Sequence, residues 1–376
     1  MMDRRFFSAS VAALVLSGCM GSTGGGGPQS SAKPVGRSRL AVVANPDFDR
    51  WLAGARGRAK ARGISDKTLS RSFPTIGYLP DVIKTDRNQS EFKRSFEDYM
   101  AIATSESRVA TGRAMLSKHA ALFSKIEAKY GVEKEVVAAV WGLESRYGSR
   151  RGDIPTLSAL ATLAYDGRRG AFFEKQLIAA LQIIQRGDIS PARMNGSWAG
   201  AMGHTQFIPT SYQAFAVDFD GDGRRDIWDD DPTDALASAA AYLSRNGWVT
   251  GARWGRESAG GDIAPAGAEG PRFSAGPNYK VLGRYNNAQK YIIGVGILSD
   301  LLAGRGGLRH RFGPDANGMR LADRIRLQKA LARAGYDVGE PDGVIGPKTI
   351  AAVRSFEQSR GLAVTGKPSI GLLAKL

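Results

Sequence analysis

The sequence predicts a mainly α-helical protein, with a large body and a small helical module at its C-terminal end. Three observations lead to this prediction. Apolar residues recur at helical spacing in several stretches, strand-like alternation is short and rare, and a glycine-rich break near residues 304–318 sets a compact tail apart. The length of 376 residues and the 43% hydrophobic content allow two or three folded domains.

Several helices are expected in the body, at residues 116–130, 133–147, 172–185, 232–246 and 292–302. Gly131 and Gly148 follow the first two and suit left-handed C-terminal caps. Residues 251–277 are rich in glycine, alanine and proline, which predicts a long surface loop of the kind that often covers a site.

The N-terminus reads as a bacterial export signal. Arg4 and Arg5 precede an apolar run at 11–16, which is too short to span a bilayer, and small residues lead to Cys19. The segment ending at Cys19 resembles a lipobox, so residues 1–18 are predicted as a lipoprotein signal peptide and Cys19 as the lipidated residue. The alternative is a plain export signal with an incidental cysteine.

A lipid anchor and a flexible tether at 19–45 would place the body in the periplasm. Met20 is not an aspartate-type inner-membrane retention signal, which favours the outer membrane over the inner one. As the single cysteine, Cys19 excludes an intramolecular disulfide and a cysteine-based zinc site.

The charge balance predicts a polyanionic partner. Lys and Arg number 52 against 36 Asp and Glu, a formal net charge of +16. The basic residues are scattered rather than grouped on a recognition helix, so an acidic extracytoplasmic polymer is favoured and nucleic acid is not expected. Three separated histidines argue against a histidine-rich zinc site, and no common hydrolase or nucleotide-binding motif is present.

Glu144, in the motif W-G-L-E-S-R-Y-G, is the first candidate for chemistry. It falls in the last turn of the helix expected at 133–147, beside an apolar stripe that includes Val140 and Leu143. Desolvation would raise the pKa of such a carboxyl group, as a general acid requires. The alternative is an ordinary exposed glutamate paired with Arg146 or Lys134.

Two further segments could bind a sugar polymer. Residues 197–212 combine glycines with Ser197 and Gln206, whose neutral groups suit sugar hydroxyls, although a tight turn between helices explains the same pattern. Residues 284–291 contain Tyr285, Asn286 and Tyr291, which could line a cleft or simply cap and pack the next helix.

An acidic loop at 218–229 has the spacing of an EF-hand calcium loop. Its aspartates occupy positions 1, 3, 5, 9 and 12, Gly223 stands at position 6, and the carbonyl of Arg224 falls at position 7. The predicted ligands are Asp218, Asp220, Asp222, Arg224, Asp226 and Asp229. The expected ion is structural, calcium before sodium, and no organic cofactor is expected. A solvated acidic loop is the alternative.

Taken together and in this order, the four segments resemble the family of lytic murein transglycosylases typified by membrane-bound lytic transglycosylase B, over approximately 46–302. The tail, with L-Q-K-A-L-A-R-A-G-Y-D and D-G-V-I-G-P-K-T, resembles a three-helix peptidoglycan-binding module in which Pro347 and Pro368 each suit a first helical position. The resemblance implies a lysozyme-like helical catalytic domain at 46–303, a linker at 304–319 and the module at 320–376.

The resemblance also implies a function. Glu144 would be the catalytic acid, and the substrate-binding residues would be Ser197, Gln206, Tyr242, Asn286 and Tyr291. The reaction would cleave the MurNAc-GlcNAc β-1,4 bond of peptidoglycan strands and form a 1,6-anhydromuramoyl end. It would act in cell-wall turnover and remodelling, where wall synthesis or remodelling proteins are candidate partners. Two alternatives stay open: a hydrolytic muramidase using Asp153 or Asp166 as second carboxylate, and a non-catalytic peptidoglycan-binding lipoprotein.

Overall fold

The computed structural model describes residues 40–88 and 94–376. The predicted signal peptide, Cys19 and the tether up to residue 39 lie outside the described residues. Among the helices within those two ranges, none combines the length and the apolar character that a membrane span needs.

The prediction of a mainly helical fold is confirmed. The helices of the body are α1 (Pro46–Ala61), α2 (Asp66–Ser72), α3 (Pro80–Arg87), α4 (Phe96–Ala103), α5 (Glu106–Lys118), α6 (Ala120–Tyr130), α7 (Lys134–Ser145), α8 (Thr156–Asp166), α9 (Gly170–Arg186), α10 (Pro209–Phe215), α11 (Thr233–Arg245), α12 (Tyr279–Tyr285) and α13 (Gln289–Leu302). A short 3₁₀ turn, η1 (Phe73–Thr75), follows α2, and the pairs β1 (Ile154–Pro155) with β2 (Asn195–Gly196) and β3 (Gly255–Glu257) with β4 (Phe273–Ala275) are antiparallel.

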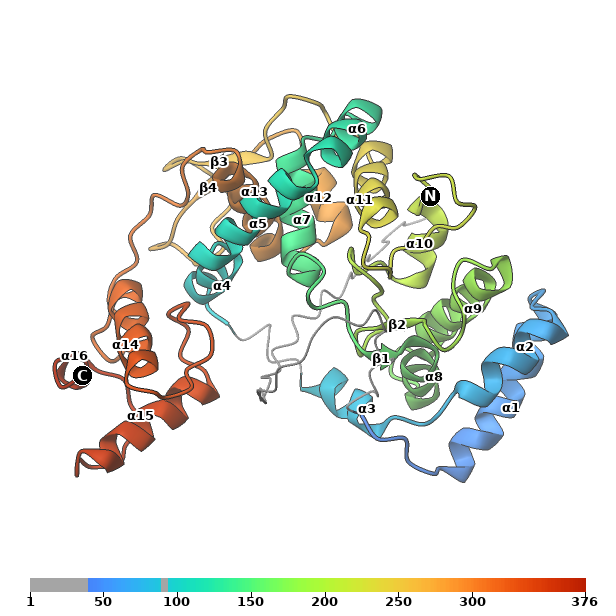
Figure 1. Ribbon diagram of the computed structural model, residues 1–376, viewed down its shortest axis with the longest axis horizontal. Coiled ribbons are helices and arrows are strands. Elements are labelled where there is room, and N and C mark those ends of the chain that lie inside the picture. Colours follow the sequence, from blue (N-terminus) through green and yellow to red (C-terminus); the bar gives the residue numbers. More distant parts are fainter. Residues whose placement is uncertain (1–39, 89–93) are drawn as a thin grey trace, which may run out of the picture.

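Helix α7 is the centre of the body. Every residue from Val136 to Ser145 is buried, and the helix packs against α13, α5, α6 and α11 (Figure 1). A helix that is enclosed on all sides can hold an ionisable side chain away from water. Helices α8 and α9 pair with each other and, with α1, α2, α3 and α10, form a second group to one side of α7 (Figure 1).

Two of the expected helices differ from the observed ones. The stretch 116–130 is divided at His119, because α5 packs mainly on α7 and α13 whereas α6 packs mainly on α11. The next helix ends at Ser145, ahead of the predicted boundary, where Arg146 adopts a left-handed conformation (φ 52°) and caps it. Gly131 caps α6 with φ 66°, as expected.

Residues 251–277, called the excursion below, are more ordered than the predicted surface loop. Strands β3 and β4 pair within it in the register Gly255↔Ala275, Arg256↔Ser274 and Glu257↔Phe273. Trp254 and Phe273 are buried and anchor the excursion on the body. Glycine-rich composition conceals such a hairpin because the strands are only three residues long.

The C-terminal module has its own core. Helices α14 (Leu321–Arg333), α15 (Pro347–Ser359) and α16 (Ile370–Leu373) enclose Leu327, Leu331, Val353 and Phe356. Pro347 opens α15 as expected, but Pro368 does not open a helix, because the Ser369 side chain caps α16 instead.

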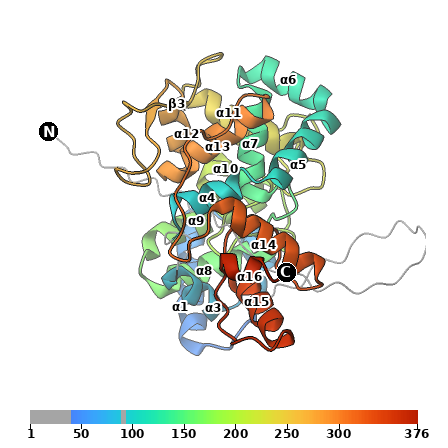
Figure 2. The ribbon, with the colours of Figure 1, turned by 90° about the vertical axis from the view of Figure 1, so that its left-hand side faces the viewer.

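The module lies against the body beside α4 (Figures 1 and 2). Buried Arg324 of α14 donates from Nη2 to Glu97 Oε2 at 2.6 Å and from Nη1 to Asp98 Oδ1 at 3.2 Å, and Glu340 pairs with Arg146 at the end of α7. The residues between body and module also pack on the body, since Leu308 and Phe312 contact its core. Ion pairs and apolar contacts therefore both join the two parts.

Candidate active site

Glu144 lies in the last turn of α7 and is only 8% exposed. The Tyr291 hydroxyl, from α13, donates to Glu144 Oε1 at 2.5 Å. Burial raises the pKa of Glu144 to about 8, although the Tyr291 hydrogen bond acts in the opposite direction by favouring the charged form. The carboxyl group is therefore protonated at neutral pH and can act as an acid.

Tyrosines form a wall beside this acid. The rings of Tyr285 and Tyr291 are 6.3 Å apart and nearly parallel, at 11°, and Tyr242 packs against Tyr285 at 4.8 Å. The Tyr285 hydroxyl donates to the carbonyl of Thr205 at 2.7 Å, which ties this wall to the glycine-rich turn. Burial raises the pKa of Tyr285 and of Tyr291 well above the ordinary value, so both remain neutral donors.

The backbone around Glu144 is strained. In the described part of the chain, the non-glycine residues with positive φ are Arg146 (52°), Tyr147 (55°) and Gln206 (51°). Gln206 is held in place by its side chain, whose Nε2 donates to the Gly203 carbonyl at 2.8 Å and to the Arg151 carbonyl at 3.0 Å. Strained residues gather at functional sites when surrounding contacts hold them.

His204 and Ser145 connect α7, the glycine-rich turn and the acidic loop. Ser145 Oγ donates to the His204 carbonyl at 2.6 Å and accepts from Gly148 N–H, so the turn is fixed directly beside the acid. The His204 ring accepts from Trp141 Nε1 at 3.0 Å and lies 2.6 Å from the carbonyl of Asp229. Burial lowers the pKa of His204 to about 4, so the ring is neutral and these contacts hold it within the packing of the site.

The other predicted substrate-binding residues are brought to the same region but make local contacts. Ser197 Oγ accepts from Ala201 N–H at 3.1 Å, Asn286 Oδ1 accepts from Ala288 N–H at 3.1 Å, and the Tyr242 hydroxyl donates to the Arg284 carbonyl at 2.5 Å. Within residues 40–88 and 94–376, Tyr291 is the residue whose side chain hydrogen-bonds to Glu144.

Two further aromatic residues belong to the site, and the sequence indicated one of them. Tyr285 stands in the motif R-Y-N-N next to Asn286 and was expected either to line a cleft or to pack the next helix. Tyr99 of α4, which the sequence did not single out, is half-buried, and desolvation together with the nearby Glu144 raises its pKa. It lies 45 positions before Glu144 in the chain, and the local sequence around it carries no sign of the contact.

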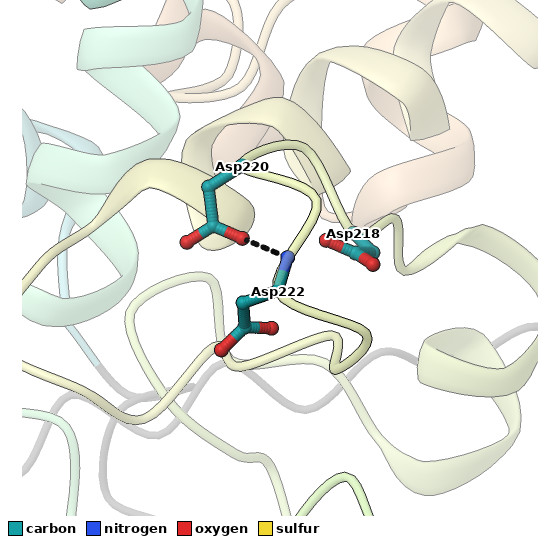
Figure 3. A group of neighbouring side chains, drawn as sticks. All are labelled: Asp218, Asp220 and Asp222. Carbon is teal, nitrogen blue, oxygen red and sulfur yellow. Dashed lines mark hydrogen bonds between the residues drawn. The ribbon is translucent and has the colours of Figure 1, made fainter.

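Three aspartates of the acidic loop converge. Carboxylate oxygens of Asp218, Asp220 and Asp222 all lie within 4.8 Å of one another (Figure 3). Loop N–H groups hold them, because Gly221 and Gly223 donate to Asp218, and Asp222 N–H donates to Asp220 Oδ1 at 3.1 Å (Figure 3). An all-oxygen donor set fits a hard cation such as calcium.

The second half of the loop departs from the predicted EF-hand geometry. Asp226 Oδ1 accepts from the N–H groups of Trp228 and Asp229, and Asp229 pairs with Arg193 at 3.4 Å instead of joining the three converging aspartates. A small cavity of about 80 Å³ still touches Asp220, Asp222, Asp226 and Asp229. The full EF-hand ligand set is therefore not assembled in this conformation.

Asp234, which the sequence did not single out, organises this loop. Its two carboxylate oxygens accept from Phe219 N–H at 2.7 Å and from Asp226 N–H at 2.9 Å. Burial raises the pKa of Asp234 to about 6. Asp234 lies in the first turn of α11, five positions after the last residue of the twelve-residue EF-hand spacing at 218–229.

The two carboxylates considered for a hydrolytic mechanism have other surroundings. Asp166, at the end of α8, pairs with Arg87 at 2.6 Å, and Asp153 is exposed. The pKa of Glu144 responds to burial and to Tyr291 rather than to a second carboxylate. A single buried acid beside stacked tyrosines, on a helical lysozyme-like scaffold, defines the class of acid-catalysed glycan-cleaving enzymes.

Comparisons with known proteins agree with this class. The family model described as "Transglycosylase SLT domain" matches residues 47–263, and a peptidoglycan binding domain model matches residues 320–376. The structure of SltB3 from Pseudomonas aeruginosa in complex with NAG-NAM-pentapeptide is 39% identical, with a TM-score of 0.69, and the match covers 88% of this chain and 100% of that one. Slt35 from Escherichia coli in complex with calcium is 26% identical, with a TM-score of 0.58, over 69% of this chain and 93% of that one.

Membrane-bound lytic murein transglycosylase B of Escherichia coli (strain K12) is 42% identical over 123 residues, which is 32% of this chain. The match spans about a third (34%) of the length of that protein. The chain belongs to the lytic murein transglycosylase family, through its SLT domain.

Proposed function

We propose that this protein is a peptidoglycan lytic transglycosylase that cleaves the MurNAc-GlcNAc β-1,4 bond and leaves a 1,6-anhydromuramoyl end. The observation that carries the proposal is the lone acid: Glu144 is buried, its pKa is raised to about 8, and one tyrosine holds it in position. The solved relative whose title names a NAG-NAM-pentapeptide ligand supports the same substrate class.

One carboxyl group suffices for this chemistry. Protonated Glu144 donates its proton to the glycosidic oxygen as that bond to C1 of the muramoyl sugar breaks. The resulting carboxylate then takes the proton from the 6-hydroxyl of the same sugar as that oxygen bonds to C1. No water is consumed, and a nucleophile within the substrate ring replaces the second carboxylate of an ordinary glycosidase.

The neighbouring residues position the acid and the glycan. Tyr291 fixes one oxygen of Glu144 and leaves the other oxygen for proton transfer. Gln206 and Asn286 use part of their amide groups in local bonds, and their remaining polar atoms are suited to sugar hydroxyls, together with Ser197 and Tyr242.

The acidic loop would hold one structural cation, calcium before sodium. Asp218, Asp220 and Asp222 already converge and would be the first ligands, and Asp226, Asp229 and the Arg224 carbonyl would complete the shell. Such an ion would stiffen the segment whose Asp229 carbonyl meets His204, and it would leave the acid chemistry to Glu144.

The chain would be divided into a catalytic domain at 46–303, a connecting segment at 304–319 and a wall-binding module at 320–376. Separate cores for the body and the module support this division.

Lipidation of Cys19 would hold the protein at a periplasmic membrane face, preferably that of the outer membrane, and wall-remodelling proteins would be its partners. The related protein named membrane-bound supports the membrane location.

Digestion of purified sacculi tests the proposal. Fragments should carry anhydro ends and be lighter by one water than hydrolytic products, as measured by mass spectrometry. Reducing ends would instead support a hydrolytic muramidase. Binding to sacculi without any release of fragments would support a non-catalytic wall-binding lipoprotein.

A further inference from the structure

A second cavity lies apart from Glu144, between the excursion and the residues that follow α13. Its volume is about 620 Å³, a size typical of small-ligand sites. Trp254, Phe273 and Ile297 form its apolar walls, and all three are buried. Ile297 follows Tyr291 by six positions on α13, a rise of roughly 9 Å, so the cavity shares a helix with the Glu144 site but is separate from it.

Buried Asp300 organises one side of this cavity. Arg253 Nη2 and Trp254 Nε1 donate to Asp300 Oδ2 at 2.8 and 3.1 Å, and Arg305 Nε donates to Oδ1 at 2.8 Å. Each guanidinium group has five N–H donors, and these bonds use one from each arginine. Two arginines from separate segments are thus fixed at the cavity with most of their donors left for a ligand.

Arginines outnumber acids around the cavity. Four guanidinium groups face two carboxylates there, those of Arg253, Arg256, Arg305 and Arg309 against Asp300 and Glu257. Arg309 is engaged with Glu257, to whose carbonyl its Nη2 donates at 2.9 Å. Arg256 is exposed on β3, and no carboxylate in the described ranges pairs with it. A rigid guanidinium fork recognises carboxylates in a bidentate manner.

We propose that this arginine cavity binds a peptide through its free carboxylates, with the peptide's apolar side chains against Trp254 and Phe273. The inference rests on the proposed function in one respect, because the wall polymer is the source of such peptides. A concave, walled cavity favours a short chain end over a flat membrane surface. The cavity would hold the peptide part of the substrate while Glu144 acts on the glycan.

Isothermal titration of the full chain tests this proposal. The probe is a short synthetic peptide with two free carboxylates and no sugar, compared with the same peptide amidated at both. We expect amidation to weaken binding at least tenfold, and Arg256→Glu to weaken binding of the free peptide at least tenfold. Arg62→Glu, which makes the same charge change at the exposed end of α1, should leave binding unchanged.

Equal binding of both peptides, or full binding by Arg256→Glu, would overturn the proposal, as would binding only to vesicles of anionic phospholipid. Release of anhydro products from peptide-free glycan is measured in parallel and should be the same in wild type and Arg256→Glu. If wild type releases none, the proposed function fails. If products form but the peptide is not bound, only the cavity assignment fails.

Discussion

The molecule contains two acidic regions that treat their carboxyl groups in opposite ways. Glu144 is alone, buried among aromatic rings, and its pKa is raised to about 8. The loop at 218–229 gathers several exposed aspartates, and there the hydrogen bonds from Arg224 lower the pKa of Asp222. Burial rather than the number of acids decides which region donates protons, whereas exposed aspartates with N–H donors remain anions that can hold a cation.

The largest expected effect is the loss of glycan cleavage when Glu144 is replaced, because only this region is expected to donate the proton. Glu144→Gln keeps the shape of the side chain but removes the transferable proton, so release of anhydro fragments from sacculi should fall roughly a thousandfold. Glu135→Gln, at the start of the same helix, is the control and should keep wild-type activity. Activity of Glu144→Gln within tenfold of wild type would remove this residue from the mechanism.

The pH dependence of the cleavage rate tests whether Glu144, unlike the exposed aspartates of the loop, has a raised pKa. Below about pH 8 Glu144 is protonated, and above that pH the protonated fraction falls about tenfold for each pH unit. The rate of glycan cleavage should therefore hold through neutral pH and decline on the alkaline side near pH 8. A profile that already declines from pH 5 upward would mean that the acid is solvated and ordinary.

Tyr291→Phe should have a smaller effect, of roughly tenfold on the rate at neutral pH, because the acid loses the bond that orients it. Since this bond favours the charged form of Glu144, its loss should raise the pKa and move the alkaline decline to higher pH. Tyr279→Phe on α12 is the matched control. A decline that moves to lower pH in Tyr291→Phe would contradict the assigned role of the hydrogen bond.

The smallest expected effect is on the stability of the acidic loop. Calcium at about a hundred times its Kd should stabilise the folded protein by roughly 2.7 kcal/mol and raise Tm by several degrees. Asp218→Asn should lose most of that rise, whereas Asp337→Asn in the module should keep it. An equal rise in both variants would place the ion elsewhere.

The general fold was predictable because helices leave local signals. Apolar periodicity located α6 and α7, and Gly131 marked the end of α6, whereas Arg146 caps α7 in place of the expected Gly148. The division at His119 depends on where α5 and α6 pack, which periodicity does not report. The excursion was predicted as a loop because its two strands are short and stabilised by burial of Trp254 and Phe273.

The site was predictable only in part, because its residues are brought together by contacts between distant parts of the chain. Glu144 and Tyr291 stand in recognisable motifs, yet their contact joins residues 147 positions apart, and Tyr99 joins them from a third helix. The aspartate spacing indicated a cation loop, but Asp229 pairs with Arg193 and Asp234 supplies the internal support. Spacing along the chain does not report which neighbour competes for a side chain in space.

The left-handed backbone at Arg146, Tyr147 and Gln206 has a consequence for the engineering of thermal stability. Each such residue costs about 1–2 kcal/mol, so glycine at these positions would relax the backbone. The same exchange would loosen the frame that keeps a reactive proton aimed at its target. Substitutions intended to raise thermal stability should therefore be made far from α7, where a gain in stability does not reduce catalytic activity.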